Sequence, residues 1–226
     1  MKPTSTIAID GPVASGKTSV GMALAKQLGF GFIDTGLMYR AVTWVAIQKN
    51  VDASDRQNVI MLAKTINIEL KANTEANGTE STYILVDGSD ITEHLRSPKV
   101  EVSVSAISSI TGVRAARVEQ QRKMAKDGKI VMVGRDIASV VLPTADLKIF
   151  LTASAAKRAK RRYEENIGTS KSKPLNEILA DLSTRDSLDT EREDSPLMVS
   201  QGSILIDTTD MTKEKVVEYI INLVRS

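Results

Sequence analysis

Residues 11–18 read Gly-Pro-Val-Ala-Ser-Gly-Lys-Thr, which matches the phosphate-binding pattern G-x-x-x-x-G-K-[ST] in full. The apolar segment Ile7-Ala8-Ile9 precedes this loop, and residues 19–28 follow it with a helical pattern that ends at Gly29. A strand, a loop and a helix in this order point backbone N–H groups and the positive end of a helix dipole at a phosphate chain. The alternative is a glycine-rich turn before a core helix, but the correct flanks on both sides favour phosphate binding.

The loop predicts a site for a nucleoside triphosphate, and ATP with Mg²⁺ is the expected pair of cofactors. Lys17 is expected to reach the β- and γ-phosphates, and the Thr18 hydroxyl is expected to ligate Mg²⁺. The residues predicted to surround the phosphates are Gly11, Pro12, Val13, Ala14, Ser15, Gly16, Lys17, Thr18 and Ser19.

Composition excludes several other chemistries. The 226-residue chain has no cysteine and one histidine, which excludes disulfides, thiolate zinc sites, thiol nucleophiles and histidine clusters. A net charge of +2 creates no strong field toward a polyanion or an anionic membrane, so no nucleic acid or membrane partner is expected. The N-terminus leads directly into the first apolar strand without an apolar leader, and a cytoplasmic location is expected.

Five short apolar segments recur along the chain with helical patterns between most of them. They are residues 6–10, 31–34, 130–134, 147–151 and 204–207. Their length and weak alternation are typical of buried parallel strands, so we predict an α/β fold with a sheet covered on both faces. Ligands bind at the carboxyl ends of such strands, and here those ends carry Asp10, Asp34, Arg135-Asp136 and Asp207.

One stretch departs from this alternation. Residues 66–71 and 83–87 have strand character and are joined by a polar loop containing Asn77-Gly78, which indicates a hairpin. We therefore predict one domain over residues 1–226 with a small insert of antiparallel strands at about residues 66–95.

Two neighbouring segments differ in charge. Lys and Arg predominate in residues 154–173, whereas Asp and Glu predominate in residues 176–195. The contrast predicts two charged surfaces with separate roles, or simply two solvated helices.

A phosphate loop alone does not separate kinases from GTPases or motor ATPases. The chain lacks Asn-Lys-x-Asp, which weakens the GTPase interpretation, and it carries several arginines near strand ends and in helix turns. The following motifs add to the loop: Asp34-Thr35-Gly36-x-Met38-Tyr39-Arg40, Asp87-Gly88-x-Asp90-Ile91-Thr92, Val113-Arg114 with Gln121-Arg122, Gly134-Arg135-Asp136-Ile137, and Arg185-Asp186-x-x-Asp189-x-x-Arg192-x-x-x-Pro196-Leu197. In this order they resemble the bacterial-type cytidylate kinases from about residue 7 to residue 223.

The resemblance implies the nucleoside monophosphate kinase fold, with a five-stranded parallel sheet, an acceptor-binding lobe at residues 35–110 and a helical lid at residues 154–174. It also implies transfer of the γ-phosphoryl group of ATP to CMP or dCMP. It assigns the CMP phosphate to Arg40 and Arg135. The residues assigned to the cytosine are Thr35, Arg114, Asp136 and Arg192. The residues assigned to the ribose are Ser105, Arg185 and Asp189.

Physical chemistry supports these assignments. Phosphate favours bidentate guanidinium groups, and the amino group of cytosine favours a carboxylate such as that of Asp136. From spacing alone, Arg185, Asp189 and Arg192 fit helix-surface ion pairs, but the order of the motifs favours the substrate site.

An ionised phosphate acceptor needs no general base, so the expected reaction rests on alignment and charge neutralisation. The residues expected to act on the transferred group are Lys17, Arg158 and Arg162, with Arg161 behind them. The basic helix and residues 168–173 are interpreted as a lid that excludes water. A solvated basic helix is the alternative, and it fits Lys157 and Lys160 best.

Three other functions remain as alternatives. A kinase for UMP or AMP would use the same fold, and a non-catalytic protein that binds ATP as a switch would use the same loop. A nucleic-acid-binding ATPase is disfavoured because the basic segment holds only one aromatic residue, Tyr163. A monomer is the expected state.

Overall fold

The computed structural model describes residues 4–74, 80–169 and 171–225. The chain forms two compact units, one built from Met1–Phe32 with Asp127–Ser226 and the other from Ile33–Lys126. Within the described residues, none of the helices is both long enough and apolar enough to cross a membrane.

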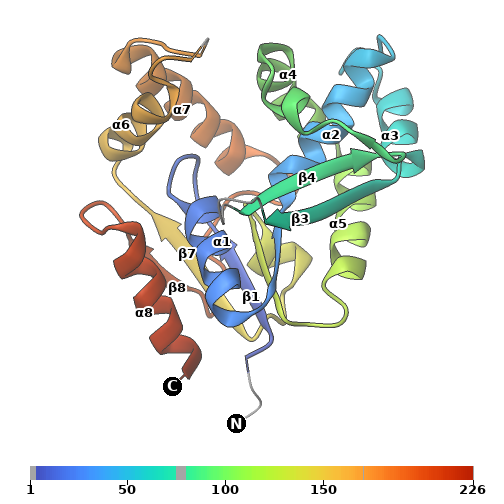
Figure 1. Cartoon of the computed structure of the whole chain (residues 1–226). Helices are drawn as coiled ribbons and strands as arrows, with labels where there is room; N and C mark the ends of the chain where they lie inside the picture. The colour runs from blue at the N-terminus through green and yellow to red at the C-terminus, as the bar shows by residue number, and fades with distance from the viewer. Residues whose placement is uncertain (1–3, 75–79, 170, 226) are drawn as a thin grey trace. The chain divides into compact units, whose positions relative to one another are not determined.

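A five-stranded sheet forms the centre of the first unit, in the order β2-β6-β1-β7-β8 (Figure 1). Its strands are β1 (Thr6–Asp10), β2 (Gly31–Asp34), β6 (Ile130–Gly134), β7 (Leu147–Thr152) and β8 (Ile204–Asp207). β1 pairs in parallel with both β6 and β7, and β7 pairs in parallel with β8. The predicted five-stranded parallel sheet is confirmed, and only β7 extends further than expected, by one residue.

Helices pack against this sheet, as the α/β pattern of the sequence predicts. The helical segments of the unit are α1 (Lys17–Leu28), the π-helical turn η2 (Ile137–Val141), α6 (Ala155–Asn166), α7 (Leu175–Glu191) and α8 (Lys213–Arg225). Ile7 and Ile9 of β1 share a buried cluster with Leu24 of α1 and Val217 of α8. Successive side chains of a strand point to opposite faces, so Asp10 faces away from this cluster and toward η2.

The phosphate loop has a small core of its own. Val13, near the middle of the loop, is buried with Ala159 of α6 and with Ile178 and Leu182 of α7. α6 and α7 lie side by side in Figure 1, joined by a short connection. The basic helix and the acidic helix of the sequence are therefore packed partners, and both contact the loop.

The second unit combines helices with a small antiparallel sheet. It contains α2 (Thr35–Gln48), α3 (Arg56–Thr65), β3 (Ile68–Thr74), β4 (Glu80–Val86), β5 (Ser89–Asp90), the 3₁₀ helix η1 (Thr92–Arg96), α4 (Pro98–Ser108) and α5 (Thr111–Met124). Asp34 caps α2 by accepting a hydrogen bond from the Gly36 N–H at 3.0 Å. A core that includes Met38, Val42, Ile84 and Ile107 holds the helices on the sheet.

β3 and β4 are antiparallel, with Ile68 opposite Val86 and Thr74 opposite Glu80. The antiparallel strands lie where the sequence predicts them, but both extend further into the polar connection than their apolar runs do. A backbone ladder does not require apolar side chains, which explains the extra length. The Asn77-Gly78 turn prediction falls outside the described residues.

Gly11 provides the first test of the fold. Its φ is +149°, and a Cβ at this position would lie 2.0 Å from the carbonyl oxygen of Leu151 in β7. We expect Gly11→Ala to lower the free energy of unfolding by about 3 kcal/mol or more, because a strand backbone cannot move aside. The measurement is urea denaturation followed by circular dichroism.

Gly29→Ala is the matched control. Gly29 also has a positive φ, of +65°, but no atom lies within 4 Å of the position of its Cβ. We expect this variant to lose only about 1 kcal/mol, which is the backbone strain alone. Equal losses in the two variants would contradict the steric role of Gly11.

Candidate active site

The phosphate loop turns from β1 into α1 through backbone conformations that favour glycine. φ is positive at Gly11, Ala14 and Gly16, and Gly16 is the N-cap of α1. Lys17 is buried, and its Nζ donates to the carbonyl oxygen of Pro12 at 2.6 Å and to the Ser15 hydroxyl at 3.3 Å. The Lys17 ammonium thus lies across the loop, in the place expected for a phosphate-binding lysine.

The other residues predicted to surround the phosphates lie in this turn and in the first turn of α1. Pro12, Val13 and Ser15 are buried, and Thr18 lies in the first turn of α1. The exposed Ser19 hydroxyl donates to the Gly16 carbonyl at 3.0 Å.

Arg158 of α6 connects this loop to α6 and α7. All three guanidinium nitrogens are used: Nε donates to the carbonyl oxygen of Ala153 at 3.0 Å, Nη1 to that of Val13 at 3.1 Å, and Nη2 pairs with Asp186 at 2.6 Å. The side chain is 8% exposed. A buried guanidinium with this many partners is well fixed, so its contacts here position the loop.

Arg161 and Arg162 differ sharply in their surroundings. Arg161 donates to the Thr208 carbonyl at 2.6 Å, to the Thr208 hydroxyl at 3.1 Å and to the Ser15 carbonyl at 3.4 Å. Arg162 instead pairs with the exposed Glu165 on the same helix, at 3.2 Å. Such a surface pair contributes little free energy, so Arg162 can leave it easily. The arrangement adds Arg161 to the residues that contact the loop.

The carboxyl end of β6 carries a second charged cluster. Arg135 Nε donates to Asp189 of α7 at 2.7 Å, and Arg192 lies 3.8 Å from the other oxygen of Asp189. Asp136, next to Arg135, is 3% exposed. The structure therefore brings Arg135 next to Asp189 and Arg192, although Asp189 lies 54 residues further along the chain.

This cluster corrects the surface-pair alternative for the α7 motif. α7 ends at Glu191, and Arg192 has extended backbone, with φ of −65° and ψ of 139°. Its Nε donates to the Ser195 carbonyl at 2.6 Å. Arg192 is not on the face of the helix, because the chain has already turned, and the side chains of Asp189 and Arg192 are only 16% and 10% exposed.

The charges of this cluster set the ionisation of Asp189. Burial alone would raise the pKa of its carboxyl, but the nearby guanidinium groups of Arg135, Arg192 and Arg185 hold the pKa below its usual value. Asp189 therefore stays an anion at neutral pH and can accept hydrogen bonds.

The second unit holds the other predicted acceptor residues. Arg40 of α2 forms a two-pronged pair with Glu101 of α4, with its two terminal nitrogens at 2.9 and 3.0 Å from the carboxylate oxygens. Arg40 also donates to the carbonyl oxygen of Leu95 at 3.0 Å. Ser105 lies one turn further along α4 and is half-buried, and Thr35 is buried in the first turn of α2.

Arg114 of α5 is held by two contacts. Its guanidinium carbon lies 5.4 Å from the centre of the Tyr39 ring, and Nη1 donates to the Ser108 carbonyl at 3.2 Å. The side chain is 2% exposed. A cation over an aromatic ring in a buried place is a stabilising arrangement, so Tyr39 fixes the direction of Arg114.

Sequence reasoning missed four residues that shape these clusters: Asp10, Tyr39, Glu101 and Asp186. Tyr39 and Asp186 lie inside quoted motifs, next to Arg40 and Arg185, so their position was a usable signal. Glu101 lies in a segment without a motif, and nothing in the sequence points to its partner.

Asp10 is the most deeply placed of the four. It is 2% exposed, and its two carboxylate oxygens accept the backbone N–H groups of Ile137 and Ala138, each at 2.8 Å. Burial raises the pKa of Asp10 to about 6 from 3.8, against the two hydrogen bonds and the charge of Lys17 that lower it, and with the neighbouring Asp136 raising it further.

This shift predicts a pH dependence of stability. A raised carboxyl pKa means that the folded state binds more protons than the unfolded state between pH 4 and 6, so Asp10 makes the protein less stable as pH rises through that window. Relative to Asp10→Asn, we expect the wild type to lose on the order of 3 kcal/mol of unfolding free energy between pH 4 and 7. Urea titrations at several pH values measure it. A pH-independent difference between the two proteins would contradict the shift.

The fit of ATP and Mg²⁺ can be judged from the loop itself. Gly11 and Gly16 have φ of +149° and +96°, and such a glycine-rich turn can present successive backbone N–H groups to a phosphate. Among the residues that the structure describes, no group of three or more acidic or histidine side chains could hold a metal. Mg²⁺ is commonly held by few protein ligands together with the phosphates of the nucleotide, so Thr18 fits as its protein ligand.

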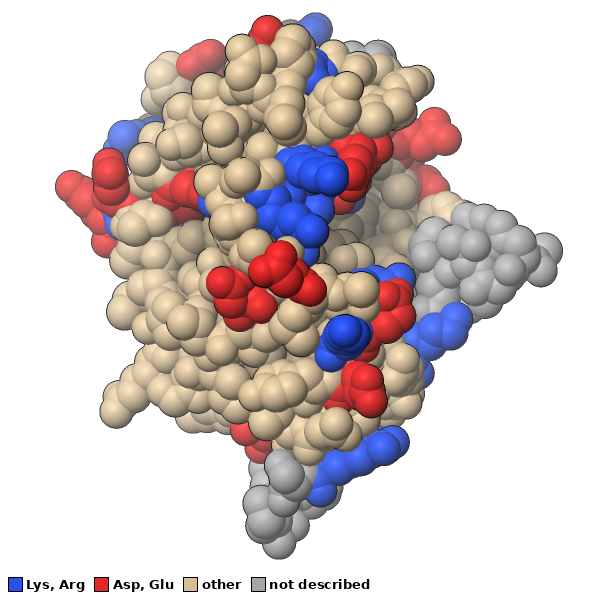
Figure 2. Space-filling model, turned by 90° about the vertical axis from the view of Figure 1, so that its left-hand side faces the viewer, with Lys and Arg blue, Asp and Glu red and all other residues tan. Residues whose placement is uncertain are grey.

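Charge on the molecular surface is interleaved. Figure 2 shows a face on which Lys and Arg side chains gather directly beside Asp and Glu side chains. Such a mixture has no extended field of one sign on that face, in agreement with the net charge of +2.

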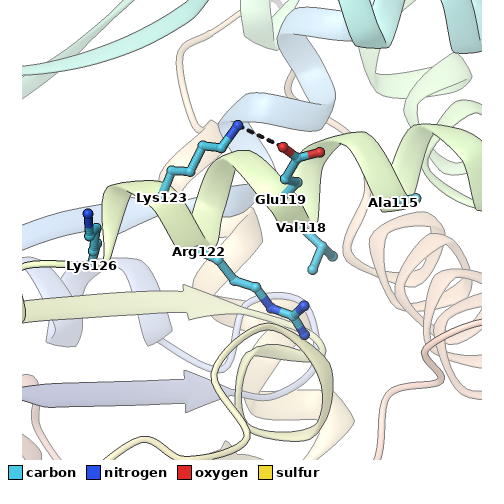
Figure 3. Close-up of a pocket in the computed structure, with 6 residues that line it drawn as sticks. All are labelled: Ala115, Val118, Glu119, Arg122, Lys123 and Lys126. Atoms are coloured by element: carbon cyan, nitrogen blue, oxygen red, sulfur yellow. Dashed lines mark hydrogen bonds and ion pairs between the residues drawn. The ribbon is translucent and has the colours of Figure 1, made fainter.

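A pocket of about 480 Å³ lies along α5, apart from the predicted site residues. Its lining residues are Ala115, Val118, Glu119, Arg122, Lys123 and Lys126 (Figure 3). Lys123 pairs with Glu119 at 2.7 Å, whereas Arg122 points away from that pair. Although Arg122 belongs to a quoted motif, this pocket contains none of the residues predicted to bind a nucleotide.

A phosphate loop between β1 and α1, a parallel sheet in the order found here and arginines gathered on the loop together define a P-loop kinase. A model of the cytidylate kinase family matches residues 7–226. The chain belongs to the cytidylate kinase family.

Individual relatives agree with the family match. The cytidylate kinase of Caldanaerobacter subterraneus subsp. tengcongensis is 43% identical over 98% of this chain and 95% of its own length. The cytidylate kinase of a Geobacillus species, strain WCH70, is 43% identical over 99% of this chain and 98% of its own. A solved structure of an uncharacterized protein from Eubacterium ventriosum shares the fold, with a TM-score of 0.53 at 14% identity over 99% of each chain.

Proposed function

We propose that this protein transfers the γ-phosphoryl group of ATP to CMP and dCMP, giving CDP or dCDP and ADP. The observation that carries the proposal is the cluster at the end of β6, where a buried carboxylate, Asp136, lies beside an arginine, Arg135, in the same unit as a complete phosphate loop. The family and its named cytidylate kinases support it. The protein acts in the cytoplasm as a monomer.

The donor half of the reaction uses the loop and the lid. The backbone from Gly11 to Ser19 surrounds the phosphates, with Lys17 directed at the β- and γ-groups. Mg²⁺, held by Thr18 and the nucleotide, supplies charge neutralisation when bound. Arg158 positions the loop through the Val13 carbonyl and acts on the transferred group together with the more exposed Arg162.

In the proposed complex, the acceptor phosphate replaces the carboxylates that pair with two arginines in the structure. Arg40 and Arg135 bind the CMP phosphate, and in the structure they are paired with Glu101 and Asp189. A carboxylate and a phosphate present similar pairs of oxygens to a guanidinium, so the exchange needs little movement of the arginine. The paired carboxylates keep each guanidinium oriented beforehand.

The nucleoside is recognised by polar groups of matching type. The buried Asp136 accepts a hydrogen bond from the cytosine amino group. Thr35, Arg114 and Arg192 surround the ring and donate hydrogen bonds to O2 and N3. Ser105, Arg185 and Asp189 bind the ribose. Because the pKa of Asp189 is held low by its arginines, its carboxylate is available to accept the ribose hydroxyl protons as hydrogen bonds.

The chemical step then needs no general base. The acceptor oxygen is already anionic, so the protein aligns it with the γ-phosphorus and stabilises the charge that spreads over the transferred group. Lys17 and Arg162 supply positive charge from the donor side, and closure of residues 154–174 excludes water that would otherwise hydrolyse ATP.

A panel of acceptors tests the proposal. Purified protein is assayed with ATP and CMP, dCMP, UMP or AMP, with ADP release measured in a coupled assay. We expect CMP and dCMP to exceed UMP in kcat/KM by roughly 10²-fold or more, because uracil has no amino group for Asp136. Preference for UMP or AMP would identify a different monophosphate kinase, and ATP turnover independent of all four would leave only an ATPase.

Asp136→Ala separates substrate binding from a structural role. We expect its kcat/KM for CMP to fall by about 10²-fold or more, because the cytosine amino group loses its acceptor. ATP binding, measured by calorimetry, should change less than twofold, because in the proposed complex Asp136 contacts CMP and not ATP. If binding of both nucleotides weakens equally, Asp136 maintains the fold and does not read cytosine.

Arg162→Ala tests the lid. We expect kcat to fall by about 10³-fold with little change in KM for CMP, because the charge matters mainly in the transition state. Lys160→Ala is the matched control on the same helix, since Lys160 lies 3.9 Å from the exposed Glu164 and faces solvent. The lid assignment fails if the two variants have similar kcat.

A further inference from the structure

The strongest feature outside the assigned residues is the buried carboxylate of Asp10. It lies at the last position of β1, opposite Gly134 of β6, and immediately before Gly11 of the phosphate loop. Building on the proposed function, we propose that Asp10 is a positioning residue for the monophosphate acceptor, which fixes Asp136 and Arg135 by binding the backbone that follows them.

The geometry ties Asp10 to one particular peptide group. The N–H that Asp10 accepts at 2.8 Å from Ile137 belongs to the peptide bond whose carbonyl is that of Asp136. That carbonyl in turn accepts from the N–H groups of Val140 at 2.9 Å and Val141 at 3.1 Å. The peptide after Asp136 is therefore held on both of its polar atoms, which fixes the point from which the Asp136 side chain projects.

The second carboxylate oxygen of Asp10 binds the next backbone N–H group. It accepts the Ala138 N–H at 2.8 Å, so a single carboxylate satisfies two successive N–H groups at the start of η2. A carboxylate can do this because both of its oxygens are acceptors, whereas an amide side chain would present an N–H₂ group to one of the two donors.

An ionised carboxylate at this buried position lowers the stability of the fold, so stability alone does not explain an aspartate here. The groups that face Asp10 with charge are Asp136, which raises the pKa of Asp10, and Lys17, which lowers it, and burial raises it most. An ionised Asp10 thus destabilises the folded protein above pH 6. The gain is a rigid turn between the strand that begins the phosphate loop and the residues that meet the acceptor.

Asp146, which directly precedes β7, offers a matched control because its carboxylate also binds backbone of the β1 segment. One of its oxygens accepts the N–H groups of Ser5 and Thr6 and the Thr6 hydroxyl, each at 2.9 Å, at the opposite end of β1. Asp146→Asn therefore perturbs a similar carboxylate-to-backbone contact, far along the strand from the loop.

The experiment compares Asp10→Asn, Asp146→Asn and wild type. We expect Asp10→Asn to raise KM for CMP by about tenfold or more with ATP binding within twofold of wild type, and Asp146→Asn to leave both unchanged. Asp10→Ser, which keeps one acceptor for a single N–H, gives a second variant should the amide misfold. An unchanged KM for CMP in a folded Asp10 variant overturns the positioning role.

Dependence on pH distinguishes positioning from support of the fold. The CMP phosphate also titrates near pH 6, so KM is taken as the ratio of variant to wild type, in which the substrate cancels. We expect this ratio for Asp10→Asn to fall toward one as the pH drops from 7 to 5, because wild-type Asp10 is then protonated, and to stay flat for Asp146→Asn. A flat ratio for both overturns the inference.

The two proposals fail in different ways. A wild type that phosphorylates none of the four monophosphates would contradict the proposed function and, with it, the role given to Asp10. A wild type active on CMP whose Asp10 variants keep a normal KM would contradict the positioning role alone.

Discussion

The close approach of Gly11 to the carbonyl oxygen of Leu151 is the constraint on which the rest of the site depends. The chain leaves β1 with a φ of +149° and passes so near β7 that a Cβ would lie 2.0 Å from that oxygen. Glycine permits both this φ and this close approach, which a residue with a Cβ would not. The Val13 carbonyl is then within reach of Arg158, and the Ser15 carbonyl within reach of Arg161.

Carboxylates fix the positions of three arginines. Arg158, Arg135 and Arg40 are held by Asp186, Asp189 and Glu101, at distances between 2.6 and 3.0 Å. A largely buried guanidinium without such a partner would be strongly destabilising, so each carboxylate makes it possible to bury its own arginine. They also fix the orientation of each guanidinium before any substrate phosphate arrives.

The sequence predicts those parts whose cause is local. The central strands β1 and β6 are recognisable because their burial requires continuous apolar runs, and the phosphate loop is recognisable because its geometry demands glycine at fixed spacing. Contacts such as Arg40 with Glu101, or Asp10 with the start of η2, join residues 61 and 127 positions apart. No local pattern encodes them. The spacing of the α7 motif also does not mark the end of the helix before Arg192, where the Leu197 N–H donates to the Asp189 carbonyl and Arg192 donates to the Ser195 carbonyl.

α7 carries the carboxylates of two of these pairs. Asp186 and Asp189 lie three residues apart, and Asp186 pairs with Arg158 of α6 while Asp189 pairs with Arg135 at the end of β6. In the proposed reaction, a phosphate that takes Arg135 leaves Asp189 with Arg192 and Arg185 only, and the pKa of Asp189 moves upward from its lowered value. Hydrogen bonds from the ribose hydroxyls to that carboxylate oppose this change. Binding of the phosphate and binding of the sugar therefore favour each other through one side chain, on the same helix that anchors the arginine beneath the phosphate loop.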